Sequence, residues 1–258
     1  ALFLKHAADV ATFYGFRPLR EVERRVPNLE RRAHSFTTAS AACVRCHSLH
    51  QGEPVLAYWA SPSPMHLPKT LKPTASSGRH GEVGEFGLNI VGVSDSIAEV
   101  VLLKAVATVI TEWGAKIARV RLNALGDKDS KIRFEREASA YLRKHAGSLH
   151  EECREKLAPY RCASEICKSV VEGGPRAMNF LSEKSRLHFK DVLELSEKLA
   201  LPYEFDDLLM GDERESRMLF AFDLKDEDAT VLGSTGGRFD DHFRIYVPRR
   251  DTAGVSAS

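Results

Sequence analysis

The sequence lacks any long apolar run and any excess of charge of one sign. No apolar stretch approaches the roughly 20 residues that a transmembrane helix needs. Lys5, His6 and Asp9 interrupt the apolar start, so we expect neither a signal peptide nor membrane contact. The 37 basic and 36 acidic side chains give a formal net charge of +1. This balance argues against a protein that binds polyanions through bulk charge and leaves only a local basic face for that role.

Cysteine is scarce, and its count is odd. A chain of 258 residues with five cysteines can bury a core without disulfides, so we expect free thiols and a reducing, cytoplasmic location. Cys43, Cys46 and His47 form the C-x-x-C-H pattern of c-type haem attachment. We do not expect haem, because its attachment requires export and no export signal is visible. A metal site or an ordinary cysteine pair in a loop are the alternatives.

The other three cysteines, Cys153, Cys162 and Cys167, fall in one short stretch. A structural zinc site takes four thiolate or imidazole ligands, and His150 or His188 could supply the fourth. Three separate buried thiols are the alternative. The sequence therefore predicts zinc or ordinary thiols here, without deciding between them.

The pattern of apolar residues predicts an alternation of helices and strands. We expect a helix over 2–14 that stops at Gly15, an irregular region over 31–80 with one strand at 54–60, and a strand over 86–93. Ser96 and Glu99 have the spacing of a capping box that starts a mostly buried helix ending at Trp113. A strand at 117–123 and a helix to about residue 145 follow.

Later residues predict an insert and further strands. We expect a small irregular insert over 148–180 that carries the cysteine cluster, a helix over 182–199, and strands near 202–209, 217–224 and 229–233. Consecutive strands with short turns predict an α+β protein with an antiparallel or mixed sheet flanked by helices. We place one core at 1–245 and a flexible tail at 246–258.

Four segments, in order, resemble one family. They are YGFRPL (14–19), EFGLNIVGVSDSIAEVVLLKAVATVITEWG (85–114), the strand and helix of 119–145, and LLMGDERESRMLFAFDL (208–224) with LGSTGGRFDD (232–241). Together they resemble the class II aminoacyl-tRNA synthetase catalytic core of the histidyl type. The resemblance implies a homodimer with an antiparallel sheet. It also implies ATP and Mg²⁺ as cofactors, attack of the histidine carboxylate on the ATP α-phosphate, and transfer to tRNA.

The resemblance places a phosphate-binding hairpin at KTLKPTASSGRHGEVGEFGL (69–88). Glu85 and Phe86 match the family motif, whereas Gly84 and Leu88 stand where the family has arginine and glutamine. Arg79 is the nearest replacement for a loop arginine. The upstream arginine-proline-glutamate segment is replaced by AYWASPSP (57–64), which carries no charge.

The histidine-binding segments are preserved in part. Met210 stands where the family has an arginine before the glycine, and methionine cannot stabilise a developing negative charge. The segment GGRFD keeps the residue types that the family has at its ligand-binding positions. These residues are Gly236, Gly237, Arg238 and Asp240. With Glu85 they form the predicted ligand-binding set. No catalytic residue is assigned, and the weak candidates are Arg79, Glu85 and Arg238.

Three hypotheses for function follow. The first is a class II core that no longer aminoacylates and acts as a binding or regulatory paralogue, as the regulatory subunit of ATP phosphoribosyltransferase does. The second is an active or truncated histidine–tRNA ligase. The third is an RNA-binding accessory protein that uses Arg24, Arg25, Arg31, Arg32 and the Arg119/Arg121 face. A homodimer, tRNA and another protein subunit are the expected partners.

Overall fold

The computed structural model describes residues 2–25, 36–50, 52–61, 85–154, 158–162, 164–211, 215–226, 229–238 and 254–257. The α-helices are α1 (Leu2–Phe13), α2 (Leu19–Arg24), α3 (Phe36–Leu49), α4 (Ile97–Glu112), α5 (Lys128–Lys144), α6 (Glu165–Glu172) and α7 (Glu183–Lys198). The strands are β1 (Arg17–Pro18), β2 (Val55–Ser61), β3 (Glu85–Val91), β4 (Lys116–Gly126), β5 (Glu204–Phe205), β6 (Ser216–Asp226), β7 (Ala229–Arg238) and β8 (Gly254–Ala257). Short 3₁₀ helices are η2 (Ala146–Ser148), η3 (Glu151–Cys153), η4 (Ala158–Arg161) and η5 (Ala177–Phe180). No helix in these ranges is long and apolar enough to cross a membrane.

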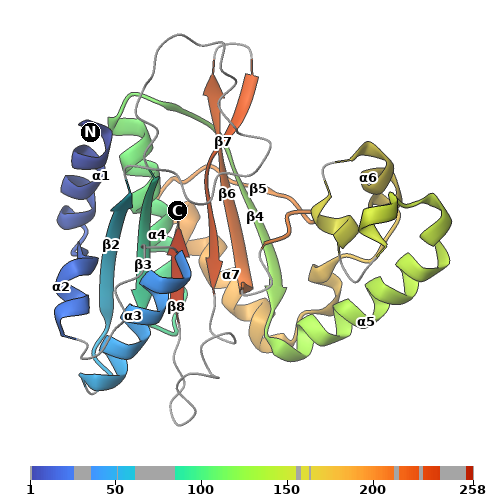
Figure 1. The fold of residues 1–258 in the computed structure, drawn as a ribbon, viewed down its shortest axis with the longest axis horizontal. Coiled ribbons are helices and arrows are strands. Elements are labelled where there is room, and N and C mark those ends of the chain that lie inside the picture. Colours follow the sequence, from blue (N-terminus) through green and yellow to red (C-terminus); the bar gives the residue numbers. More distant parts are fainter. Residues whose placement is uncertain are drawn as a thin grey trace.

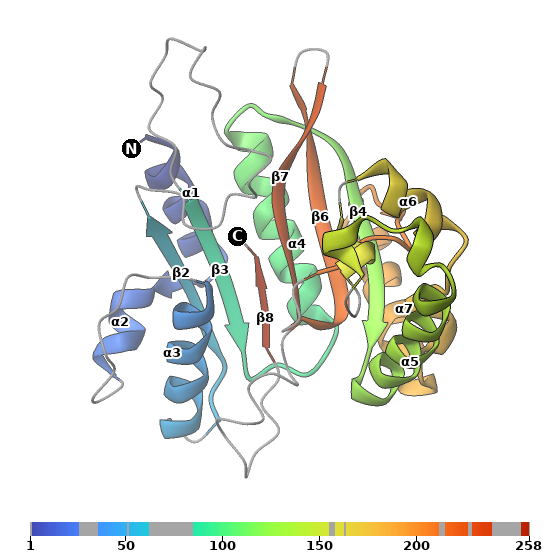
Figure 2. The same ribbon diagram turned by 45° about the vertical axis from the view of Figure 1, so that its right-hand side comes forward.

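An eight-stranded sheet runs through the molecule in the order β1-β2-β3-β8-β7-β6-β4-β5 (Figure 1). The outermost pairs, β1–β2 and β4–β5, are parallel, and the other neighbours are antiparallel. Figure 2 shows α3 and α4 on opposite sides of the sheet. The predicted α+β class with a mixed, helix-flanked sheet is confirmed. The strand expected near 202–209 is shorter than predicted. Within that range, only Glu204 and Phe205 pair with β4.

Helix α4 forms the centre of the main core. It contacts α1, α7 and the sheet, so apolar side chains are needed almost all round it. Leu102 and Leu103 are buried with Leu88 of β3 and Phe220 of β6. The partly buried hydroxyls of Thr108 in α4 and of Tyr14 lie 2.9 Å apart. Gly15 and Gly114 end α1 and α4 with positive φ, as the sequence predicts.

The tail predicted at 246–258 is wrong for its last residues. Residues 254–257 form β8, which pairs antiparallel with β3 on one side and with β7 on the other. Within the described residues, β3 and β7 do not pair with each other, so β8 joins the two halves of the sheet. The physical reason is that the edges of β3 and β7 would otherwise leave backbone N–H and C=O groups unpaired inside the sheet.

The irregular region predicted at 31–80 contains α3, so this prediction is wrong for residues 36–49. The helix packs through small side chains, Ala39, Ala42 and Cys43, against Val91 and other buried residues of β2 and β3. The strand predicted at 54–60 is confirmed as β2. Residues 31–35 and 62–80 lie outside the described residues.

Side-chain caps are found at the starts of α5 and α7 and not at the predicted position before α4. The Ser96 side chain makes no capping hydrogen bond at α4, so the predicted capping box is wrong. Asp127 instead caps α5 by accepting from the Ser130 backbone N–H at 3.0 Å, and it also accepts from the Ser182 hydroxyl at 2.6 Å. Ser182 caps α7 by accepting from the Ser185 N–H at 3.1 Å. Asp127 therefore ties the starts of the two helices together.

The stretch predicted as an insert consists of α6 and short 3₁₀ helices that stand apart from the sheet beside α5 (Figure 1). It has its own cluster of buried side chains, in which Phe134 of α5 packs edge-on against Tyr160 at 5.4 Å between ring centroids. Leu125 and Leu219 connect this cluster to β4 and β6. The insert is thus a second, smaller core attached to the end of the sheet.

Candidate functional site

Of the phosphate-binding hairpin predicted at 69–88, the structure describes residues 85–88, which lie in β3 and pair with β2. The two strands pair antiparallel, with Trp59 opposite Gly87 and Ser61 opposite Glu85. Residues 57–61 of the segment AYWASPSP therefore lie in the strand that precedes β3 in this hairpin, and residues 62–64 lie outside the described residues. Arg79 and Gly84 lie between the strands, outside the described residues.

One face of this hairpin is packed against α3. Trp59 is 3% exposed, and a Cβ added at Gly87 would overlap its indole ring. The buried Ser40 hydroxyl of α3 donates to Asn89 Oδ1 at 2.8 Å. Because side chains alternate along a strand, Glu85 is on the same face as Gly87 and Asn89. Neither VLAYWAS nor EFGLNIV contains a lysine or arginine, so neither strand offers a cation to this face.

The paired glycines lie at the end of β7 and are buried. Gly236 and Gly237 pair with Phe220 and Leu219 of β6 on one side and with β8 on the other. A Cβ at Gly237 would lie 2.7 Å from the Met218 carbonyl oxygen. The close backbone approach that these glycines permit is therefore made to β6. Asp240, the last member of the predicted set, lies outside the described residues.

Arg238 is completely buried and forms a bidentate ion pair with Glu99 of α4, which is also completely buried. Its Nη2 donates to Glu99 Oε2 at 2.7 Å, and its Nε donates to Oε1. The guanidinium also donates to the carbonyl oxygens of Val93 at 3.2 Å and Asp95 at 3.0 Å. His188 of α7 completes the group, with Nε2 at 2.6 Å from Glu99 Oε1. Arg238, a predicted ligand-binding residue, therefore lies inside the protein and is paired there.

This network joins three distant parts of the chain: α4, α7 and the end of β7. Burial opposes the charge on Glu99, but hydrogen bonds from Arg238 and His188 outweigh it and hold the pKa of Glu99 below its usual value. Sequence reasoning missed Glu99 as a site residue. The sequence did contain a signal for it: Glu99 is a carboxylate in the first turn of a helix whose other residues are almost all apolar.

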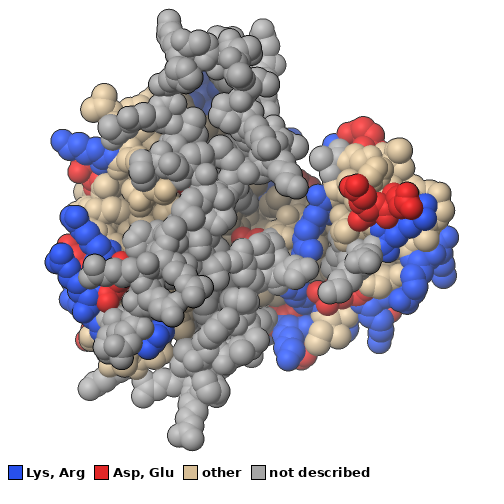
Figure 3. Space-filling view, viewed as in Figure 1, with Lys and Arg blue, Asp and Glu red and all other residues tan. Residues whose placement is uncertain are grey.

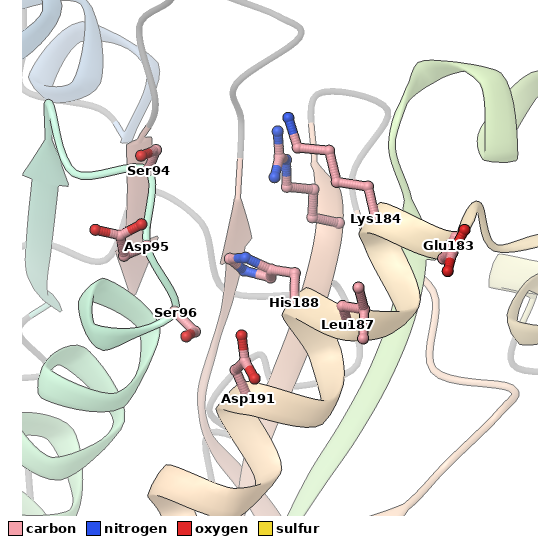
Figure 4. Close-up of a pocket in the computed structure, with 9 residues that line it drawn as sticks. Ser94, Asp95, Ser96, Glu183, Lys184, Leu187, His188 and Asp191 are labelled. Carbon is pink, nitrogen blue, oxygen red and sulfur yellow. The ribbon is translucent and has the colours of Figure 1, made fainter.

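A polar cleft lies directly beside the network, with a volume of about 510 Å³ (Figure 4). His188 belongs to both. The cleft is formed by the turn before α4, the first half of α7 and the start of β6; its lining is Ser94, Asp95, Ser96, Glu183, Lys184, Leu187, His188, Asp191 and Arg217. Three carboxylates and two cations make a mixed lining, which suits a small polar ligand better than a polyanion.

The predicted basic face of β4 is neutralised. Arg119 and Arg121 both pair with Asp223 at 2.8 Å, and Arg121 also pairs with Asp206 at 2.8 Å. Figure 3 shows Lys and Arg side chains along the edges formed by α2 and α5, interspersed with acidic ones. Arg24 and Arg25 are exposed on that α2 edge, whereas Arg31 and Arg32 lie outside the described residues.

The structure brings Cys153, Cys162 and Cys167 together, with all three sulfur atoms within 4.8 Å of one another. Neither histidine proposed as the fourth ligand joins them: His188 bonds Glu99, and His150 is exposed outside the group. The C-x-x-C-H pattern is on α3 and not in the predicted loop. There His47 Nδ1 lies 2.6 Å from the Glu53 carbonyl oxygen.

Comparison with known proteins finds similarity to histidine–tRNA ligases in both sequence and structure. The histidine–tRNA ligase of Chlorobium phaeobacteroides is 29% identical over 190 residues, which are 71% of this chain and 44% of that protein. Apo histidyl-tRNA synthetase from S. aureus superposes with a TM-score of 0.68 at 17% identity, covering 99% of this chain and 66% of that chain. The chain therefore has the class II fold, and it is similar in sequence to histidine–tRNA ligases.

A second structural likeness concerns an assembly. The class II core also superposes on a chain of the ATP phosphoribosyl transferase complex from Thermotoga maritima, with a TM-score of 0.51 and 14% identity, covering 99% of this chain and 94% of that chain. No family model matches the chain. The chain spans less than half the length of the Chlorobium phaeobacteroides ligase, because the match covers 44% of that protein.

Proposed function

We propose that this class II core is a binding or regulatory paralogue of histidyl-tRNA synthetase that does not activate histidine. The observation that carries the proposal is the β2–β3 hairpin, whose strands supply no cation and whose face toward α3 is filled by Trp59. Adenylate formation depends on positive groups that clamp the phosphates of ATP and neutralise charge in the transition state.

Two residues of the predicted histidine-binding segments support the same proposal, one retained and one replaced. Arg238 persists in sequence, but its guanidinium is buried against Glu99 and two backbone carbonyls. Met210, in the place of a family arginine, packs against the core of the insert. The retained Arg238 therefore holds the scaffold together, which is expected where a fold outlives its chemistry.

The partner proposed for such a paralogue is a second copy of the chain or another protein subunit in the cytoplasm. The likeness to a chain of an ATP phosphoribosyl transferase complex supports a role within an assembly. The second candidate function, a histidine–tRNA ligase that uses ATP and Mg²⁺, is favoured by the curated relatives. A role in binding tRNA has less support, because Arg119 and Arg121 are paired with carboxylates.

Thermal unfolding in the presence of ligands tests the proposal. A ligand present at 100 times its Kd stabilises the native state by about 2.7 kcal/mol, which raises the unfolding midpoint measurably. We expect histidine and MgATP, added together, to shift the midpoint no more than Mg²⁺ and histidine without ATP. A further rise that requires both histidine and ATP would contradict the proposal and favour the ligase.

A further inference from the structure

The cysteine cluster has the geometry of a metal site at a junction of three separate elements. Cys153 ends η3, Cys162 directly follows η4, and Cys167 lies in the first turn of α6. Their sulfur atoms all lie within 4.8 Å of one another. In a tetrahedral zinc–thiolate site, a Zn–S distance of about 2.3 Å gives sulfur atoms about 3.8 Å apart. Movements of about 1 Å or less would therefore bring all three sulfurs to bonding distance from one ion.

We propose that Cys153, Cys162 and Cys167 bind one soft divalent metal ion of the Zn²⁺ type, with water as the fourth ligand. Binding converts three thiols to thiolates and forms three metal–sulfur bonds, so three protons are released for each ion bound. Among the described residues, no histidine or carboxylate joins the three sulfurs. The proposed site is therefore a three-thiolate site with an exchangeable fourth position.

One sulfur of the cluster accepts a backbone hydrogen bond. The Ser164 backbone N–H donates to Cys162 Sγ at 3.4 Å, which is the kind of hydrogen bond that stabilises a ligating sulfur. Cys167 lies in the first turn of α6 and is buried, whereas Cys153 and Cys162 are partly exposed and give an ion access from solvent.

A disulfide explains the cluster less well. An S–S bond of about 2.05 Å joins two sulfurs and leaves the third as a free thiol beside it. In the structure all five described cysteines are free. The convergence brings together all three cysteine sulfurs of the insert, which is what one metal ion requires and one disulfide does not.

The site would fix the insert against the sheet. Arg161, which precedes Cys162, donates through Nε to the Gly211 carbonyl oxygen at 2.8 Å. Arg176, beyond α6, pairs with Asp207 at 3.0 Å. A metal that joins η4 to α6 would therefore hold both arginines in place. It would thereby position the loop around 206–211, which precedes β6.

Metal analysis of the intact chain, purified without chelators and with added ZnCl₂, tests the proposal. We expect about one zinc ion per chain. We also expect Co²⁺ to give intense thiolate-to-metal absorption near the ultraviolet, together with visible bands of tetrahedral cobalt. Cys153→Ser and Cys162→Ser change partly exposed residues and should each abolish stoichiometric binding. The paired variant C43A/C46A is the matched control and should keep the full metal content.

Hydrogen exchange on the wild-type chain tests the metal site without requiring that a cysteine variant folds. With the wild-type chain, zinc should slow exchange in peptides covering 158–172 and 206–211 and leave those of α1 unchanged. Zinc content that survives Cys162→Ser in a folded protein would overturn the proposal. A count of three rather than five free thiols in unreduced protein, with a disulfide mapped inside the cluster, would overturn it as well.

Discussion

Replacing Arg238 by methionine isolates the role of the buried ion pair. Arg238 and Glu99 are both completely buried, and the guanidinium makes two hydrogen bonds to the carboxylate and two to backbone carbonyls. Methionine fills much of the same volume but leaves the Glu99 carboxylate without its cation. Breaking a buried pair in this way costs about 3–5 kcal/mol, which is a large share of the roughly 5–15 kcal/mol that stabilises a typical domain.

Urea unfolding followed by circular dichroism measures this cost. We expect Arg238→Met to lower the free energy of unfolding by about 3–5 kcal/mol, and R238M/E99Q to recover part of the loss because no buried charge remains. Arg186→Met, on the exposed side of α7, is the control and should change stability by less than about 0.5 kcal/mol. A loss below about 1 kcal/mol for Arg238→Met would refute the structural role and return Arg238 to the ligand-binding set.

Two further predictions concern a helix cap and the packed hairpin. The pKa of Asp127 is lowered to about 2, because hydrogen bonds from Ser182 and Ser130 outweigh the opposing effect of burial. Its stabilisation is therefore present above the ordinary carboxyl pKa of about 4 and is lost as the pH falls toward about 2. Asp127→Ala should cost about 1 kcal/mol at pH 7 and almost nothing at pH 2, after allowance for solvent screening; an equal loss at both pH values would contradict the cap. Gly87→Ala should cost about 1–3 kcal/mol in urea unfolding, because its Cβ overlaps the buried Trp59 ring, whereas Gly147→Ala has open space and should change little. Equal stability of the two alanine variants would show that α3 and Trp59 do not fill this face.

The sequence predicts the regular elements well where periodicity is local. The strand and helix of 85–114 and the helix capped by Ser182 are visible because apolar spacing and stop signals lie within a few residues of one another. Helix α3 escaped prediction because alanine, serine, threonine and cysteine make its buried face small and weakly apolar. Strand β8 escaped because GVSA is short, and only the gap between β3 and β7 makes it a strand.

The predicted ligand-binding site also depends on contacts between residues far apart in the sequence, which the sequence alone does not reveal. The motif around Arg238 was visible in the sequence, but its partner Glu99 is 139 residues away. The spacing of Ser96 and Glu99 matches a capping box, yet burial turns the carboxylate inward to the guanidinium instead. Conversely, the cysteine cluster could be predicted because its members are close in sequence, while their convergence depends on how η4 and α6 fold against α5.

Histidine-dependent exchange of pyrophosphate into ATP tests the central claim most directly, because exchange reports formation of histidyl-adenylate without needing tRNA. The intact chain should be assayed with Mg²⁺ beside an active histidine–tRNA ligase at equal concentration, with each reaction repeated without histidine. The lack of a phosphate-clamping cation on β2 and β3 predicts no exchange above the histidine-free background. Exchange that requires histidine and scales with the concentration of this chain would contradict the account and establish the protein as a ligase.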